Sequence, residues 1–231
     1  MSARIKPIMV VIPAYNEEQN LRMLLPRIPR SVNGVELGVL VIDDGSSDDT
    51  CAVAQSLGTV VVRNIVNRGQ GASTRLGCDI LKRYGVKIGV AMDADNQHRP
   101  EDIEPMLQPI LEDRYDLVIG SRILGSREKD SQIRFFGVKL LTAVINLLTN
   151  LKLTDCSSGF KAFKLEELSV LKLYEEQFQA AETLIVAAKA GLRIGEVPIH
   201  IKRRSFGMSK KGANLRYGLM FAKTIIKALW R

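Results

Sequence analysis

Short runs of β-branched and other apolar residues alternate with longer segments of helical periodicity along the first hundred residues. The apolar runs cover residues 8–13, 38–43, 59–63 and 87–93, and helical patterns lie between them at 17–28, 47–57 and 71–84. Strands that alternate with helices in this way indicate βαβ units, which build a parallel sheet. The pattern therefore predicts an α/β fold, with a Rossmann-like, mostly parallel sheet flanked by helices.

The pattern changes after residue 93. We expect a helix at 100–113, a strand at 116–122, a basic loop at 125–134, a helix at 134–150, a turn at 155–163, helices at 165–174 and 180–190, a strand at 193–201, a second basic loop and a final helix at 213–231. A chain of 231 residues fits one large domain with a modest appendage. We therefore predict a main domain over residues 1–212 and an amphipathic C-terminal helix over 213–231 that faces a membrane or a partner.

Composition narrows the classes of partner. The chain has 33 Lys and Arg against 25 Asp and Glu, a formal net charge of +8, which suggests an anionic partner such as nucleic acid, a phosphorylated substrate or an acidic membrane surface. The sequence shows no basic platform interleaved with aromatic residues, which disfavours nucleic acid. The three cysteines lie far apart and form no CxxC, so they indicate neither a disulfide framework nor a zinc site. The N-terminus does not resemble a signal peptide, and no run of 18 apolar residues is present, so we expect a cytoplasmic protein without a transmembrane helix.

The residues that follow the predicted strands are unusually polar. In a parallel sheet, ligands bind outside the carboxyl ends of the strands. The polar sets there are Pro13, Tyr15, Asn16 and Glu17 after the first strand, Asp43, Asp44 and Gly45 after the second, and Asp93, Asp95 and Gln97 after the fourth. The segment PAYNEEQN lacks the GxGxxG of dinucleotide-binding domains, so a diphosphate would need another source of positive charge. Mg²⁺ or Mn²⁺ would supply it, because hard cations prefer carboxylate oxygens and bridge to phosphates.

Asp93 and Asp95 are the strongest candidates for metal ligands. Side chains two residues apart in an extended chain project to the same side, so both carboxylates can face one ion. A lone DxD can equally be a turn whose aspartates cap the next helix, and His98 is expected to be a surface turn residue. The other motifs of the chain decide between these interpretations.

Seven motifs occur in the order and at about the spacing seen in inverting family 2 glycosyltransferases of the GT-A fold. They are VVIPAYNEEQNL, VIDDGSSDDT, NRGQGAS, DADNQHRPED, VIGSR, DCSSGFKAF and VPIHIKRRSFGMSKKG, and they span residues 8 to about 212. The chain most resembles the dolichyl-phosphate mannose synthase and polyprenyl-phosphate glycosyltransferase group. The resemblance implies transfer of a sugar from GDP-mannose or a UDP-hexose to a polyprenyl or dolichyl phosphate.

The resemblance also assigns roles to residues. It implies that Asp93, Asp95 and Gln97 form the metal and diphosphate centre, and that Arg122 takes part in catalysis beside them. The implied nucleotide-sugar site comprises Pro13, Tyr15, Glu17, Asp43, Asp44, Gly45, Arg68, Gly71, Asp93, Ala94, Asp95, Arg204 and Lys210. The implied acceptor-phosphate site comprises Ser121, Arg122 and Arg134. Three alternatives remain open, because Gln97 could contact the sugar instead of the metal, Asp43 could hold the following loop instead of the base, and Arg127 competes with Arg134.

With a lipid phosphate as acceptor, the enzyme would need arginines to bind the phosphate but no general base to activate it. Arginine suits phosphate because its planar fork binds two oxygens and stays charged. An alcohol nucleophile usually needs a general base, whereas a phosphate is already an anion at neutral pH. We therefore expect no catalytic base, and Glu182 can have a capping or surface role instead.

Two helical segments suggest attachment to a membrane. In the final helix, the basic residues Arg216, Lys223, Lys227 and Arg231 share one face, and Leu215, Leu219, Ala222, Ile226 and Trp230 share another. Residues 135–151 resemble the membrane-proximal helix of the family. Neither segment is long enough to span, and both could instead pack on the core. We expect a peripheral enzyme on the cytoplasmic face of a membrane, docked to a small integral membrane protein.

Two other functions compete with this prediction. The first is transfer to a saccharide or protein hydroxyl, although the QxxRW motif of processive synthases is absent. The second is a noncatalytic subunit that binds a nucleotide sugar, against which the intact acidic motifs argue.

Overall fold

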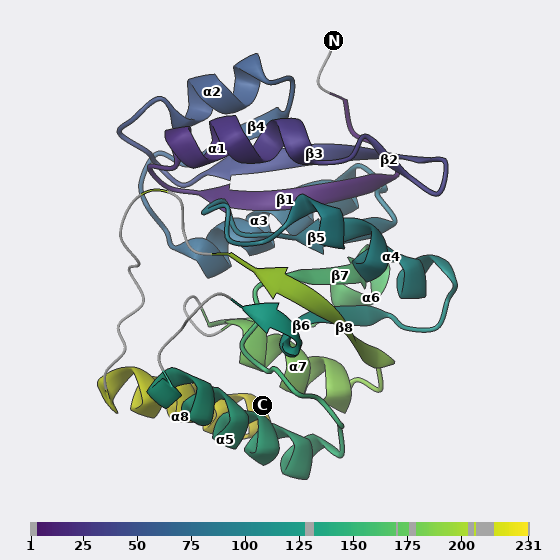
Figure 1. Ribbon diagram of the computed structural model, residues 1–231, viewed down its shortest axis with the longest axis vertical. Coiled ribbons are helices and arrows are strands. Elements are labelled where there is room, and N and C mark those ends of the chain that lie inside the picture. The colour runs from purple at the N-terminus through teal and green to yellow at the C-terminus, as the bar shows by residue number, and fades with distance from the viewer. Residues whose placement is uncertain are drawn as a thin grey trace.

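The computed structural model describes residues 4–127, 132–169, 171–175, 179–202, 206 and 215–230 (Figure 1). Its centre is a mixed sheet with the strand order β4-β3-β1-β5-β7-β6-β8. The strands are β1 (Ile8–Ala14), β3 (Val35–Asp43), β4 (Val60–Arg63), β5 (Ile88–Ala91), β6 (Leu117–Arg127), β7 (Lys161–Lys164) and β8 (Ile194–Ile201), and a short strand β2 (Ser31–Val32) forms a hairpin with β3. Of these strands, β2 and β7 run against the others, so the sheet is mostly parallel. The predicted α/β fold with a mostly parallel sheet is confirmed.

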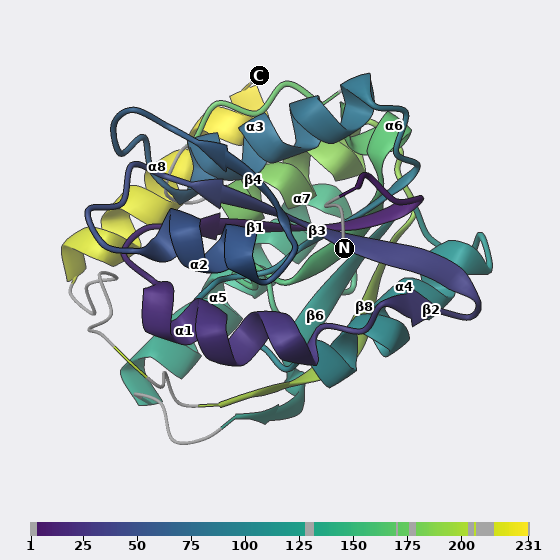
Figure 2. The same cartoon turned by 90° about the horizontal axis from the view of Figure 1, so that it is seen from above.

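Helices cover both faces of the sheet. One apolar core lies under α1 (Glu18–Leu24), α2 (Thr50–Ser56) and α4 (Ile103–Leu111), and a second lies under α3 (Gln70–Arg83), α6 (Leu165–Ser169) and α7 (Gln179–Lys189) (Figure 2). Two 3₁₀ helices, η1 (Leu25–Arg27) and η2 (Pro100–Asp102), adjoin α1 and α4. This three-layer arrangement buries the central strands on both faces, which explains their continuous apolar runs.

Two further helices, α5 (Gln132–Thr149) and α8 (Leu215–Trp230), lie side by side at one end of the molecule (Figure 1). Phe221, Ile225 and Ala228 of α8 are buried in the second core, and Lys227 pairs with Glu175 at 3.2 Å. The helix therefore packs on the domain through a face that neither predicted stripe contains. In the described part of the chain, every helix is too short or too polar to cross a bilayer.

Three expectations about the second half of the chain were wrong. Residues 161–164 form strand β7 where we expected a turn, and β6 continues to Arg127, well into the expected basic loop. The helix expected at 165–174 ends at Ser169, since residues 171–175 are not helical. The tetrapeptide KAFK is too short and too rich in lysine for its alternation to indicate a strand, and its pairing with β5 and β6 depends on residues far away in the sequence.

Candidate active site

The carboxyl ends of β1, β3 and β5 meet at one edge of the sheet. Ala14 at the end of β1 pairs with Asp43 at the end of β3, and β5 ends on the other side of β1, where Ala91 pairs with Val11. The polar segments that follow these strands are therefore neighbours, as the sequence predicts. Pro13 and Tyr15 at the end of β1 are both half-buried at this edge.

Asp44 holds the loop that precedes α3. Its buried carboxylate accepts hydrogen bonds from the Asn64 amide at 2.7 Å, from the Arg68 backbone N–H at 3.0 Å and from the Gly69 backbone N–H at 2.8 Å. These contacts shape the NRGQGAS segment, in which the Arg68 side chain is exposed and Gly71 is buried. The predicted contact of Asp44 with the nucleotide remains a prediction, because its described bonds are with the loop.

Gly45 allows this loop to approach the end of β3. Its φ of +77° is in the left-handed region, and a Cβ atom there would lie 2.9 Å from the carbonyl carbon of Val66. Both conditions exclude a larger residue. Gly45 is therefore required by the shape of the loop, whether or not it contacts a nucleotide.

Asp43 is fully buried at the same strand end. Its Oδ1 accepts the backbone N–H of Ser46 at 3.0 Å, while its Oδ2 lies 3.2 Å from Nε of Arg63 without forming a hydrogen bond. The distance is that of an ion pair, but the N–H does not point at the oxygen, so we infer attraction between charges only. Asp43 thus holds its loop and retains an acceptor atom, which keeps both predicted roles open.

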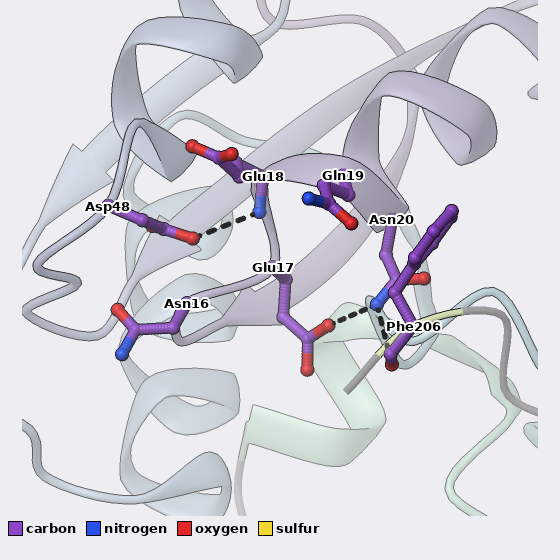
Figure 3. Close-up of a pocket in the computed structure, with 7 residues that line it drawn as sticks. All are labelled: Asn16, Glu17, Glu18, Gln19, Asn20, Asp48 and Phe206. Atoms are coloured by element: carbon purple, nitrogen blue, oxygen red, sulfur yellow. Dashed lines mark hydrogen bonds between the residues drawn. The ribbon is translucent and has the colours of Figure 1, made fainter. Parts of the chain in front are cut away.

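A small cavity of about 240 Å³ lies where β1 leads into α1 (Figure 3). Its lining consists of Asn16, Glu17, Glu18, Gln19, Asn20, Asp48 and Phe206. The Glu17 carboxylate accepts a 2.6 Å hydrogen bond from the Asn20 amide, which also donates to the carbonyl of Phe206 at 3.4 Å (Figure 3). A wall rich in carboxylates suits the N–H groups of a base or the hydroxyls of a sugar better than a phosphate. The predicted contact of Glu17 with the nucleotide remains a prediction.

Asp93 and Asp95 lie on the loop that leaves β5, and both are half-buried. Gln70, at the start of α3, donates a hydrogen bond to Oδ1 of Asp93, and Oδ1 of Asp95 accepts the backbone N–H of Gln97 at 3.1 Å. Asn96 between them has a φ of +62°, a conformation that asparagine tolerates better than most residues. Ala94, which the resemblance assigns to the nucleotide site, is buried in the core.

His98 supports this loop from beneath. Its imidazole Nδ1 accepts the backbone N–H of Asp93 at 3.3 Å, and its ring stacks on Phe160 with centroids 5.0 Å apart. The expectation that His98 is a surface turn residue was wrong, since 6% of it is exposed. Its stacking and its hydrogen bond bury the ring and fix the backbone of Asp93.

Gln97 connects the acidic loop to β8. Its side-chain amide donates to the carbonyl of Lys202 at 3.2 Å, and its own carbonyl accepts the Lys202 N–H at 3.0 Å. The chain then continues toward Arg204 and Lys210, which lie outside the described residues. The end of β8 is therefore tied to the predicted metal site.

The oxygen atoms at this edge suit a hard divalent cation whose remaining ligands come from a bound substrate. Asp93 and Asp95 offer carboxylate oxygens, and the side-chain oxygen of Gln97 is of a type that such cations also accept. Within the described ranges, no group of three or more His, Cys, Asp or Glu side chains could hold a metal. Mg²⁺ and Mn²⁺ fit two carboxylates when phosphate and water oxygens complete the shell.

Arg122 is held firmly on β6 by a buried carboxylate. Its Nε and Nη2 donate to the two oxygens of Asp155 at 2.6 and 2.7 Å, and Nη2 also donates to Ser157. Burial alone would raise the pKa of Asp155, but hydrogen bonds and charge from Arg122 outweigh it, so the pKa lies below its ordinary value. A bidentate pair of this kind fixes the guanidinium in orientation. The predicted role of Arg122 toward the acceptor stays a prediction.

The other two residues predicted to bind the acceptor phosphate are Ser121, which is buried, and Arg134, whose side chain lies outside the described part of the structure. The Ser121 hydroxyl is fully buried, shares a 2.6 Å hydrogen bond with Thr154 and accepts the backbone N–H groups of Ile123 and Leu124. It holds the part of β6 after Ser121, where the register with β8 shifts. The side chains of Arg127 and Arg134 are outside the described part, so the choice between them stays open.

Sequence reasoning missed the contribution of the SGFK segment, residues 158–161. A Cβ atom on Gly159 would lie 3.0 Å from Oδ1 of Asp93, so the carboxylate occupies the space that a larger residue at 159 would need. Phe160 stacks under His98, and Lys161 is buried on β7 beside β5. Burial lowers the pKa of Lys161 to about 8, although Cys78, Asp93 and Glu182 act in the opposite direction. The motif DCSSGFKAF was the available signal, but its interpretation as a turn concealed these roles.

Glu182 has a structural role. Its buried carboxylate accepts the backbone N–H of Tyr174 at 2.9 and 3.1 Å and that of Glu175 at 2.9 Å. These bonds hold the segment before α7, which agrees with its omission from the predicted catalytic residues.

Known protein sequences include one family model and several relatives that match most of this chain. Residues 9–170 match glycosyl transferase family 2. The chain is 32% identical over 238 residues to the UDP-N-acetylglucosamine–dolichyl-phosphate N-acetylglucosaminyltransferase of Methanococcus voltae, and the match covers 92% of each chain. It is also 32% identical over 222 residues to the polyprenol monophosphomannose synthase of Mycolicibacterium smegmatis, covering 90% of this chain and 82% of that protein.

Solved structures confirm the GT-A fold. Glucosyl-3-phosphoglycerate synthase from Mycobacterium tuberculosis, in a complex with Mn²⁺, UDP and glucosyl-3-phosphoglycerate, is similar with a TM-score of 0.76 and 21% sequence identity. The match covers 97% of this chain and 80% of that protein. At this identity the likeness concerns the fold, while the matched family and the two sequence relatives show that the chain belongs to the family 2 glycosyltransferases.

Proposed function

We propose that the protein is an inverting, metal-dependent glycosyltransferase that moves a sugar from GDP-mannose or a UDP-hexose to a polyprenyl or dolichyl phosphate. The observation that carries the proposal is the convergence of Asp93 and Asp95 with the ends of β1 and β3 at one edge of the sheet. The two relatives named above act on dolichyl phosphate or make a polyprenol monophosphate sugar, which supports the acceptor class. Their sugars differ, so we leave both donor classes in the proposal.

Asp93, Asp95 and Gln97 would hold Mg²⁺ or Mn²⁺ in this reaction. When bound, such a cation neutralises charge on the departing nucleoside diphosphate. The Gln70 amide keeps the Asp93 carboxylate in place, and His98 fixes its main chain. Glu17, Asp43 and the loop held by Asp44 border the nucleotide.

The acceptor needs orientation more than activation. Its phosphate oxygen is already anionic at neutral pH and can attack the anomeric carbon without a general base. Glu182, the acid nearest in sequence to a catalytic position of the family, is bound to backbone N–H groups and is not needed for proton transfer. Arg122, fixed by Asp155, would present its guanidinium to the acceptor phosphate.

The α5 and α8 helices would lie on the membrane that contains the acceptor. Exposed apolar side chains follow one stripe of α5, at Phe136, Leu140 and Leu147, and Trp230 of α8 is 88% exposed. Lys139, Lys223 and Lys227 are exposed on the same two helices. Apolar groups with adjacent lysines suit the interface of an anionic bilayer, where each basic residue contributes about 1 kcal/mol. This surface would place the enzyme on the cytoplasmic leaflet, either directly or beside a small integral membrane protein.

An acceptor competition tests the proposal. The protein is incubated with Mn²⁺ or Mg²⁺, labelled GDP-mannose, UDP-glucose or UDP-N-acetylglucosamine, and an equimolar mixture of polyprenyl phosphate and polyprenol. We expect label only in the phosphate-linked lipid. Label in polyprenol, or in added saccharide or protein, would assign the enzyme to a hydroxyl acceptor. Calorimetric binding of a donor without any transfer would instead indicate a noncatalytic subunit.

A further inference from the structure

Lys161 lies on β7, the strand beside the one that leads to Asp93. Strand β7 runs antiparallel to β5, with Lys161 opposite Ala91, two residues before Asp93. At Gly159, two residues before Lys161, the Asp93 carboxylate lies 3.0 Å from the position that a Cβ atom would take. Asp93 is among the charged groups that act on the Lys161 ammonium. The lysine therefore belongs to the surroundings of Asp93, although it is 8% exposed and does not open into the site.

The ammonium of Lys161 has few hydrogen bonds for a buried charge. Among the described residues, its hydrogen-bond partner is the carbonyl of Ala180 at a distance of 3.5 Å. An ammonium has three donors, and burying one with so little compensation costs several kcal/mol. A methionine would fill the same space at lower cost. The position therefore suggests that the charge itself is required.

Of the groups around Lys161, Asp93 is the carboxylate that faces the site. Cys78 is a neutral thiol, because burial raises its pKa to about 12. Glu182 carries a carboxylate, but it is bound to the backbone of residues 174 and 175. Glu182 still acts on Lys161, but its influence on the pKa of the lysine is smaller than that of Asp93. The positive charge of Lys161 thus acts on the first of the two proposed metal ligands.

We propose that Lys161 is a positioning residue whose buried charge offsets Asp93, weakening metal binding by the protein alone so that the cation binds together with the nucleoside diphosphate. The inference rests on the proposed metal-dependent function. Without a nucleotide, the site offers two carboxylates opposed by one ammonium. A bound nucleoside diphosphate adds negative charge on the solvent side of the two carboxylates and so raises the affinity for the cation. By linkage, the nucleotide must then bind more tightly when the metal is present, by the same factor.

The test measures Mn²⁺ binding by electron paramagnetic resonance, first with Mn²⁺ alone and then with UDP or GDP. Lys161→Met removes the charge at similar volume, and Lys161→Gln removes the charge but retains a donor for the Ala180 carbonyl. We expect both variants to bind Mn²⁺ alone about 10-fold to 100-fold more tightly than wild type, as removal of one neighbouring like charge implies. The gain in affinity that the nucleotide causes should shrink by a similar factor.

Lys164→Met is the matched control, because it removes a lysine from the same strand at the surface. It should leave both Mn²⁺ affinities unchanged. If Lys161→Met does not fold, the Mn²⁺ affinity of Lys161→Gln tests the inference by itself. Wild-type affinity for Mn²⁺ alone in the folded charge-free variants would overturn the inference while leaving the metal site intact. Failure of the wild-type protein to bind Mn²⁺ with either nucleotide would overturn the proposed metal dependence itself, and the inference with it.

Discussion

Strand β7 carries two lysines three residues apart whose surroundings differ in almost every respect. Lys164 pairs with Asp113 and Asp116 at the surface, and these partners raise its pKa above the ordinary value. Lys161 is buried with one long hydrogen bond, and burial lowers its pKa to about 8. Both lie beside carboxylates, but only the surface pair is arranged to satisfy its charges.

The different surroundings of the two lysines distinguish a structural ion-pair network around Lys164 from the proposed metal site near Lys161. Arg193 joins Lys164 in the network, donating to Asp116 at 2.7 and 3.0 Å, so each charge there has several partners. At the other end of the strand, the carboxylates of Asp93 and Asp95 lie half-exposed, and the poorly compensated ammonium of Lys161 belongs to the strand beside β5. An arrangement that leaves charges poorly satisfied is typical of a functional site. Four predictions follow from this contrast between the two ends of β7.

Asp95→Asn should produce the largest effect. The substitution keeps the size of the side chain but removes one of two proposed ligand charges. We expect turnover to fall about 100-fold or more, the range found when an electrostatic group at a reacting centre is lost. Thermal unfolding should stay unchanged, because the side chain is half-exposed. Wild-type transfer by a folded variant would remove Asp95 from the site.

Lys161→Met should separate activity from stability. Changes to the groups that surround metal ligands typically cost about 10-fold to 100-fold in activity, and we expect turnover at saturating donor and metal to fall by about tenfold. The free energy of unfolding should remain equal or increase, since an apolar residue replaces a poorly compensated buried charge. Steady-state kinetics and urea unfolding measure both quantities. A large loss of stability with unchanged turnover would make Lys161 purely structural.

Lys164→Met should lower the stability of the protein and leave its turnover unchanged. It removes a partner of Asp113 and Asp116 and should reduce the free energy of unfolding by about 1 kcal/mol, the upper range for surface pairs. The melting temperature would fall by about 2–4 °C for a chain of this size. Turnover should be that of wild type, and a kinetic defect comparable to that of Lys161→Met would abolish the contrast between the two lysines.

Asp116→Asn should have the smallest effect, and one that depends on pH. Hydrogen bonds from Arg193 and Lys164 hold the pKa of Asp116 below its ordinary value. A carboxylate whose pKa is depressed by folding stabilises the protein above its unfolded pKa, near 4, and loses that contribution as the pH falls further. Urea unfolding should therefore show wild type more stable than the variant at pH 7, with a smaller difference at pH 3. Equal differences at both values would exclude the ion pairs as the cause.

The alternation of strands and helices was sufficient to predict the first half of the fold and the edge where Asp43 and Asp93 meet. That success has a physical reason, because parallel strands buried on both faces leave continuous apolar runs, and their ends are the places where polar residues must emerge. The second half was harder. Strand β7 is held by neighbours distant in sequence, so its four residues carry little local signal.

The site was predictable as a set of motifs but not as a set of contacts. Asp155 binds the guanidinium of Arg122 across 33 residues of sequence, and the stacking of His98 on Phe160 requires β5 and β7 to be adjacent. No spacing rule indicates such pairs. The use of the Asp44 carboxylate to hold the loop before α3 likewise appears only when the backbone N–H groups of that loop are placed.

Formation of a lipid-linked sugar tests the central claim most directly. Purified protein, Mn²⁺, polyprenyl phosphate and each labelled nucleotide sugar are combined, with Asp95→Asn as the matched control. The account predicts that one donor yields a labelled glycosyl phosphate lipid, that chelation of the metal abolishes it, and that the variant makes at most about one hundredth as much. Absence of labelled lipid with every donor, or equal product after complete removal of divalent metal, would contradict it.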